Sequence, residues 1–144
     1  MVLEATAPYS HQQHGTAERV NWTIVELAQA MLIHRDLPVF LWEGAISHVA
    51  YLRNRASTRA LQGKTPYAMW TGQKLDVSHL REFGSDVWVL LEGQPDKLQP
   101  KVAKFILMGY TDDLSSIRLY DARTRWIRSS RNFQFELDLT PSIR

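Results

Sequence analysis

Cysteine is absent from this sequence of 144 residues, which excludes disulfide bonds, thiolate zinc sites and a cysteine nucleophile. Long apolar runs are also absent, since none approaches the roughly 18 residues that a membrane-spanning helix needs. The N-terminal stretch MVLEATAPYS lacks the basic and apolar regions of a secretory signal peptide. The sequence therefore predicts an intracellular chain that has no membrane partner.

A large excess of charge is missing as well, because 17 Lys and Arg residues against 15 Asp and Glu residues give a net charge of +2. The charges are unevenly distributed: no acidic residue lies between Glu43 and Asp76, and Asp121 alone interrupts a second basic stretch at residues 118–131. Two local basic blocks favour contact with a polyanion, because counterion release scales with the number of phosphates neutralised. A solvated arginine-rich face is the alternative interpretation. The cations are Arg53, Arg55, Arg59, Lys64 and Lys74, and then Arg118, Arg123, Arg125, Arg128 and Arg131.

The first half of the chain has the periodicity of amphipathic helices. Apolar residues recur three and four positions apart, as on one face of a helix, and capping residues bound each such stretch. The apolar stripe of the first helix consists of Val20, Ile24, Leu27, Ala28 and Met31. The predicted helices cover residues 17–35, 39–54 and 66–70, with Thr16 and Thr65 as N-caps and Pro38 and Gly72 as stop signals.

The second half, after a joint near residues 75–84, changes to short runs rich in β-branched and aromatic residues. Four or five strands in about 55 residues predict a small antiparallel barrel. Most aromatic side chains should belong to its core, while the arginines should face outward. The predicted strands cover residues 86–92, 104–111, 117–120 and 126–134, the aromatic residues are Trp88, Tyr110, Tyr120, Trp126 and Phe133, and the outward arginines are Arg118, Arg128 and Arg131.

The apolar stripes of the helices need a surface to pack against, and no strands in the first half supply one. In one interpretation the stripes pack against each other and against the barrel. In the other, the natural partner is missing and the chain associates with itself through unpaired stripes. The second alternative predicts a barrel that folds alone beside loose or oligomeric helices.

The segment at residues 7–21, APYSHQQHGTAERVN, leads directly into the first predicted helix. It resembles the segment around the last acidic residue of retroviral-type integrases, in the form found in copia-type LTR retrotransposons. The resemblance covers about residues 4–138 through a series of short motifs in order. They include LP (37–38), LW (41–42), YLRNR (51–55), TPY (65–67), WTG (70–72), SHLR (78–81), FG (83–84), GY (109–110) and YD (120–121).

This resemblance implies an α+β chain with two domains. Residues 1–75 would be the helical C-terminal part of an RNase H-like integrase catalytic core. Residues 80–138 would be the small antiparallel SH3-like β-barrel that follows the core. The parent function implied for such a fragment of a retrotransposon polyprotein is DNA integration by divalent-metal-dependent strand transfer.

Glu18 matches the family's catalytic glutamate, the third member of an Asp, Asp, Glu set that holds two Mg²⁺ or Mn²⁺ ions. Such a metal pair activates the attacking oxygen and stabilises the leaving one. The family's two aspartates lie upstream of this segment, and Glu26 and Asp36 match neither of them. We therefore expect this chain alone to hold no metal and to be catalytically incomplete. A zinc site made by His11, His14 and Glu18 is an alternative, but solvated loop histidines are the simpler interpretation.

The resemblance also implies a nucleic-acid partner (element and target DNA, or RNA) and a nuclear location. Polar residues beside Glu18 would face a phosphate backbone in the family context, and the basic blocks would add further contacts. A host-retained interaction module and a pseudogene product are the alternatives for the whole chain. The candidate nucleic-acid-binding residues are Gln12, Gln13, Arg19, Asn21, Arg53, Arg55, Lys64, Arg118, Arg128 and Arg131.

Overall fold

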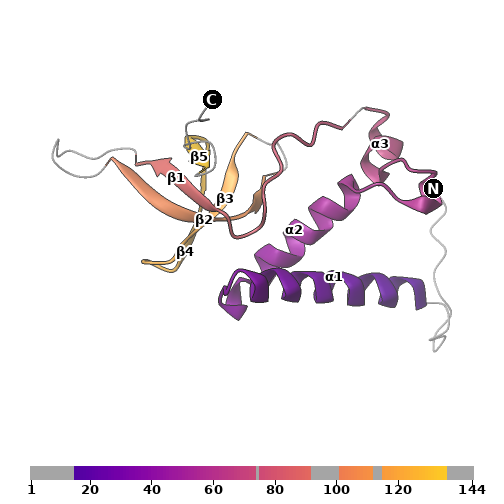
Figure 1. Cartoon of the computed structure of the whole chain (residues 1–144), viewed down its shortest axis with the longest axis horizontal. Coiled ribbons are helices and arrows are strands. Elements are labelled where there is room, and N and C mark those ends of the chain that lie inside the picture. Colours follow the sequence, from indigo (N-terminus) through magenta and orange to yellow (C-terminus); the bar gives the residue numbers. More distant parts are fainter. Residues whose placement is uncertain (1–14, 74, 92–100, 112–114, 136–144) are drawn as a thin grey trace, which may run out of the picture.

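The computed structural model describes residues 15–73, 75–91, 101–111 and 115–135, and in this part the chain has an α+β fold. Helical elements come first and a five-stranded sheet follows, as the periodicities predict (Figure 1). The helical elements are α1 (Gly15–His34), the 3₁₀ turn η2 (Val39–Leu41), α2 (Trp42–Arg55), the 3₁₀ turn η3 (Arg59–Leu61) and α3 (Pro66–Thr71). The strands are β1 (Asp86–Leu90), β2 (Val102–Tyr110), β3 (Ile117–Asp121), β4 (Trp126–Ser130) and β5 (Phe133–Phe135).

Helices α1 and α2 form a hairpin whose closed end lies beside the sheet, while α3 lies near the opposite end of α2 (Figure 1). The hairpin turns at Asp36, which has a positive φ of 48°, and at Pro38, which cannot continue a helix. Helix α1 begins at Gly15, so Thr16 is not its N-cap. The other predicted cap is confirmed: the Thr65 hydroxyl oxygen accepts a hydrogen bond from the Ala68 amide of α3 at 3.1 Å.

The antiparallel sheet has the strand order β4-β3-β2-β1-β5 and curls into a small barrel. Neighbouring strands lie about 4.8 Å apart, so a flat sheet of this order would hold its two edges about 19 Å apart. Yet only residues 131–132 join β4 at one edge to β5 at the other, and they span about 10 Å at most. The single strand predicted over residues 126–134 is therefore wrong, because the chain crosses between the two edges at this point.

Two clusters of buried side chains hold the fold together. Alternate residues of the strands point inward and fill the barrel, while residues on the outer face of β2 and β3 join side chains from the hairpin. The barrel cluster consists of Val87, Val89, Phe105, Leu107, Ile117, Leu119 and Phe135. The shared cluster, which connects helices and sheet, consists of Ala28, Leu32, Leu41, Ala45, Val49, Phe83, Met108 and Tyr120.

In the shared cluster, buried residues of the two helices pack against each other and against Met108 and Tyr120 of the sheet, as the first interpretation predicts. Leu27 of the first stripe remains 47% exposed, and self-association through exposed apolar side chains stays a prediction. The expected aromatic core is only partly right: Trp88 and Tyr110 are half-buried, and Trp126 is 69% exposed because it lies on an edge strand. None of the described helices is long and apolar enough to cross a membrane.

Candidate nucleic-acid interface

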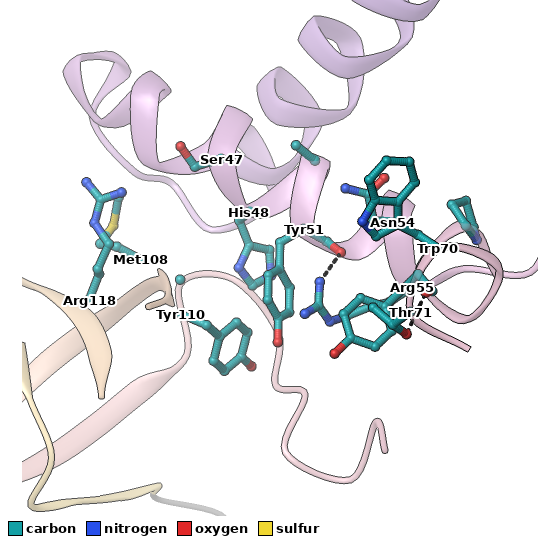
Figure 2. A pocket seen from close by; sticks show the side chains of 14 residues that line it. Ser47, His48, Tyr51, Asn54, Arg55, Trp70, Thr71, Met108, Tyr110 and Arg118 are labelled. Carbon is teal, nitrogen blue, oxygen red and sulfur yellow. Dashed lines mark hydrogen bonds between the residues drawn. The ribbon is translucent and has the colours of Figure 1, made fainter. Parts of the chain in front are cut away.

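A groove of about 710 Å³ lies where α2 and α3 meet the end of β2 and the start of β3. Such a volume lies within the range of about 300–1,000 Å³ that ligand sites occupy. Figure 2 shows Arg118 and Met108 at one end, Trp70 and Thr71 at the other, and His48, Tyr51 and Tyr110 between them. We call this feature the α2–β2 groove.

One face of α2 forms a wall of the groove. His48, Tyr51 and Arg55 follow one another at helical spacing and line it together. Gly44 begins the same row, one turn before His48, and its lack of a side chain lets the sheet approach: a Cβ atom there would lie 2.5 Å from the terminal methyl carbon of Met108. Ala45 and Val49, on an adjacent face of α2, belong to the shared cluster.

Stacked rings form the centre of the groove. The Tyr110 ring lies 5.0 Å from the Tyr51 ring and 5.7 Å from the His48 ring, with interplanar angles of 30° and 26°. The Tyr51 hydroxyl shares a hydrogen bond of 2.8 Å with Nε2 of His79, and the Tyr110 hydroxyl oxygen accepts one of 2.7 Å from the Arg81 amide. Burial raises the pKa of both Tyr51 and Tyr110, so both phenols are protonated at neutral pH.

Arg55 is held by aromatic rings. Its guanidinium carbon lies 3.4 Å from the centroid of the Tyr51 ring and 4.9 Å from that of Tyr67. Nη1 donates a hydrogen bond of 3.2 Å to the Tyr51 carbonyl oxygen, whereas the buried Nε has no hydrogen-bond partner among the described residues. Stacking on rings fixes the position of the cation without neutralising it. The charge of Arg55 therefore remains available to an anion.

His48 lies at the inner side of the groove and is only 1% exposed. Burial lowers its pKa to about 4, so the imidazole is neutral at pH 7, with one N–H donor and one acceptor nitrogen. Neither nitrogen has a hydrogen-bond partner in the described part of the chain. Leaving a buried polar group unpaired costs about 1–3 kcal/mol, which marks His48 as a residue that needs explanation by a ligand or by water.

The groove is basic and has an aromatic residue at its open end. Arg55 and Arg118 line it, and no carboxylate does so among the described residues. Glu43 lies outside the lining, with its Oε1 atom 4.0 Å from Nη2 of Arg118, and its side chain is 75% exposed, so water screens this pair strongly. Trp70 is 88% exposed although it carries the largest apolar ring system of any residue type.

Three of the candidate residues lie on the exposed first turns of α1, where the sequence predicts them: Glu18, Arg19 and Asn21. Gln12 and Gln13, as well as the two loop histidines of the zinc alternative, lie outside the described residues. Within the described ranges no three His, Asp or Glu side chains come together as metal ligands. Glu18 therefore does not make a two-metal site with residues that the structure describes.

The structure separates the basic residues of the first block. Arg55 lines the groove. Arg53, two positions earlier, is half-buried against α1, and its Nη1 atom lies 3.5 Å from the Val20 carbonyl oxygen. Arg53 thus contacts α1 and does not line the groove. Lys64 is exposed in the turn after η3, outside the groove lining.

The arginines of the second block do not share one outward face. Arg118 pairs with Ser129 across β3 and β4, and Leu119 pairs with Arg128, so Arg118 and Arg128 point to opposite faces of the sheet. Arg118 is turned toward the helices, with a side chain 32% exposed. Arg128 lies on the other face, 5.8 Å from the Phe105 ring centroid, and Arg131 is exposed between β4 and β5. Arg118 thus lies on the outer face of the barrel, whereas Arg128 shares the face of Leu119 and Phe105, whose side chains fill the barrel.

Several groove residues were not among the candidates from sequence, namely His48, Tyr51, Tyr67, Trp70 and Tyr110. One signal was present in the sequence: His48 and Tyr51 lie on one face of the predicted helix 39–54, beside its apolar stripe, and Arg55 follows that helix at the same helical spacing. The pairing of that row with Tyr110 depends on how the helix docks on the sheet, which no local pattern contains.

Comparison with known proteins gives matches over nearly the whole chain. Residues 85–143 match the retroviral polymerase SH3-like domain. The chain is 35% identical over 133 residues to the retrovirus-related Pol polyprotein from transposon TNT 1-94 of Nicotiana tabacum, which covers 92% of this chain and 10% of that polyprotein. It is 30% identical over 130 residues to that from transposon RE2 of Arabidopsis thaliana, covering 90% of this chain and 9% of the relative.

A third relative is the transposon Ty1-DR6 Gag-Pol polyprotein of Saccharomyces cerevisiae, which is 32% identical over 97 residues, or 67% of this chain and 5% of that polyprotein. The chain thus spans about a tenth or less of the length of these curated relatives. No solved structure matches it significantly. These matches confirm the resemblance to copia-type retrotransposon polyproteins and the SH3-like half of the fold.

Proposed function

Residues 85–143 belong to the retroviral polymerase SH3-like domain family, and from this membership we propose that the chain is a nucleic-acid-binding segment of the integrase region of a copia-type Pol polyprotein. In this proposal residues 1–75 are the C-terminal part of an RNase H-like core, and residues 80–138 are the SH3-like domain. The helical hairpin then serves as one wall of a binding surface that the SH3-like sheet completes.

One observation carries the proposal: the α2–β2 groove brings Arg55 and Arg118 to one concave surface that no described carboxylate lines. The two arginines come from the two separate basic blocks of the sequence, and folding places them at the same site. A concave surface of one charge sign attracts a polyanion, and phosphate contacts by arginine supply most sequence-independent affinity.

A salt titration of binding tests the proposal. Fluorescence anisotropy of a labelled DNA duplex with the full chain should show an affinity that falls linearly on a log–log plot as salt rises, with a slope of about −0.9 per phosphate contact. Replacing both groove cations, Arg55→Gln and Arg118→Gln, should weaken binding and make the slope shallower by about 2. The matched control replaces two exposed cations outside the groove, Lys101→Gln and Arg123→Gln.

The groove variant should lose more affinity than this control. Equal losses in the two double variants would show that binding is not localised at the groove. The absence of any duplex binding at low salt would end the proposal.

The proposal extends to the parent reaction, DNA integration by metal-dependent strand transfer, with Glu18 as one carboxylate of the metal site. The described residues provide no second or third ligand near Glu18, and in this proposal the two family aspartates lie upstream of the segment that carries Glu18. Upstream coding sequence tests this: two aspartates on predicted strands would support it, and their absence would rule it out. Glu18→Gln should leave nucleic-acid binding by this chain intact.

A nuclear location follows from the same proposal, since chromosomal DNA is the target of integration. A fluorescent fusion of the chain, expressed in plant or yeast cells, should accumulate in the nucleus. Exclusion of the fusion from the nucleus would contradict this part of the proposal without affecting binding in solution.

A further inference from the structure

The α2–β2 groove contains features that phosphate binding does not require. A surface for phosphates alone needs cations, yet the open end of this groove carries the 88% exposed ring of Trp70, and its inner side carries the unpaired nitrogens of His48. Figure 2 shows Arg118 at the far end from Trp70, with the stacked rings of Tyr51 and Tyr110 between them.

Local structure holds Trp70 in place. Helix α3 begins with Pro66 at its first turn behind the N-cap Thr65, and it ends at Gly72, whose φ of 69° suits a residue without a side chain. The Gly72 amide donates a hydrogen bond of 2.9 Å to the Ala68 carbonyl oxygen, which closes the turn. Trp70 is thus displayed on a short capped element, in contrast to a side chain on a loose loop.

We propose that the α2–β2 groove binds an unpaired stretch of nucleic acid, with one base stacked on Trp70, a phosphate at Arg55 and another phosphate further along the strand at Arg118. This inference rests on the proposed nucleic-acid function and names the form of nucleic acid that the groove takes. Base faces are exposed in a single strand and covered in a duplex, so stacking on an aromatic side chain selects unpaired nucleotides.

An acidic peptide is the competing ligand, because carboxylates would also be attracted to the two arginines. It fits the groove less well, since an aspartate or glutamate side chain has no planar ring to cover Trp70. A single strand therefore fits the two cations and the exposed ring together, which an acidic peptide does not.

Binding of an oligothymidylate of about 12 nucleotides, a length suited to single-strand sites, tests the proposal. Its affinity for the full chain is measured by fluorescence anisotropy at low salt, beside that of a duplex of the same length. Trp70→Ala should weaken oligothymidylate binding at least about fivefold, the lower limit for losing one base–aromatic stack, and should change duplex binding less than twofold. Trp70→Phe should retain part of the affinity, because it keeps a ring.

Trp126→Ala is the matched control, since Trp126 is 69% exposed on β4 and does not line the groove. Thermal unfolding of each variant verifies that both surface substitutions leave the fold intact. If Trp70→Ala and Trp126→Ala changed the affinity for the oligothymidylate equally, this proposal would be overturned. Duplex binding by the same chain would still support the proposed nucleic-acid function. If the unaltered chain bound neither the oligothymidylate nor the duplex, both this proposal and the proposed function would be overturned. If poly-glutamate displaced the oligothymidylate completely and Trp70→Ala had no effect on the affinity, the groove would be assigned to an acidic peptide and not to a nucleotide.

Discussion

His48 is a buried polar residue whose side chain gains no described hydrogen bond to offset its removal from water. It is almost inaccessible, its ring lies between Phe83 and Tyr110, and neither nitrogen has a described hydrogen-bond partner. Its folded-state pKa of about 4 is lower than the ordinary value of 6.5, because burial disfavours the charged form. In the unfolded chain His48 binds a proton more readily than in the folded chain.

This difference predicts how stability depends on pH. Between pH 6.5 and about 4, His48 binds a proton in the unfolded chain but not in the folded chain. Its contribution to the free energy of unfolding is therefore complete above pH 6.5 and decreases as the pH falls below that value. The loss should be about 1–2 kcal/mol from pH 6.5 to pH 5. Denaturant unfolding at several pH values measures it, and His48→Leu should remove this part of the pH dependence. An unchanged pH profile in His48→Leu would show that other groups cause it.

The neighbouring arginines show where single-residue reasoning from sequence stops. Arg53 and Arg55 stand two positions apart in one motif, and nothing local distinguishes them as phosphate contacts. In the fold, Arg53 approaches a backbone carbonyl of α1, while Arg55 stacks on two tyrosines at the groove. The distinction depends on the two faces of α2, one toward α1 and one toward the sheet.

At the scale of elements, the sequence predicts those parts of the fold whose signals are local. Helix α3 is predicted at nearly its observed bounds because its N-cap Thr65, its first-turn proline and its stop signal Gly72 are adjacent in the chain. The β4–β5 crossing is missed because residues 126–134 read as one β-rich run. Only closure of the sheet, a property of all five strands, determines that the run divides at residues 131–132.

Thr65→Ala should loosen α3. Its hydroxyl oxygen accepts the Ala68 amide, and removing such a cap costs about 0.5–2 kcal/mol. Hydrogen exchange at the Ala68 amide should accelerate about 2- to 30-fold, which is the change in rate that corresponds to a loss of about 0.5–2 kcal/mol. Thr58→Ala is the control, because Thr58 precedes η3 without a side-chain cap bond among the described residues. Equal acceleration in both variants, or none in Thr65→Ala, would contradict the assigned cap.

At the scale of the whole molecule, the shared cluster couples the two halves of the chain. Met108 of β2 contributes to the same buried cluster as Ala45 and Val49 of α2, while its neighbour Leu107 belongs to the barrel cluster, because consecutive residues of a strand point to opposite faces of the sheet. A chain built in this way should unfold as one unit. Helical periodicity alone could not predict this coupling, because the partner residues lie in the other half of the sequence.

Calorimetry should therefore show one transition whose calorimetric and van't Hoff enthalpies agree. Met108→Ala should destabilise the helices and the sheet together by about 2–5 kcal/mol, as expected for truncating a buried methionine. Val102→Ala on the same strand, where Val102 is 43% exposed, should change stability by about 0.5 kcal/mol or less. Two separate transitions, with only the helical one shifted by Met108→Ala, would restore the expectation of loosely attached helices.

The central claim is that nucleic acid binds between α2, α3 and the end of β2, and the indole signals of the five tryptophans test it most directly. Each of Trp22, Trp42, Trp70, Trp88 and Trp126 gives one side-chain N–H resonance, and Trp70 is the member of this set that lines the groove. Titrating the labelled full chain with oligothymidylate should shift the Trp70 indole resonance most, together with the backbone amides of Gly109 and Tyr110. Shifts confined to Trp126 and the β4 amides, with Trp70 unchanged, would contradict the account.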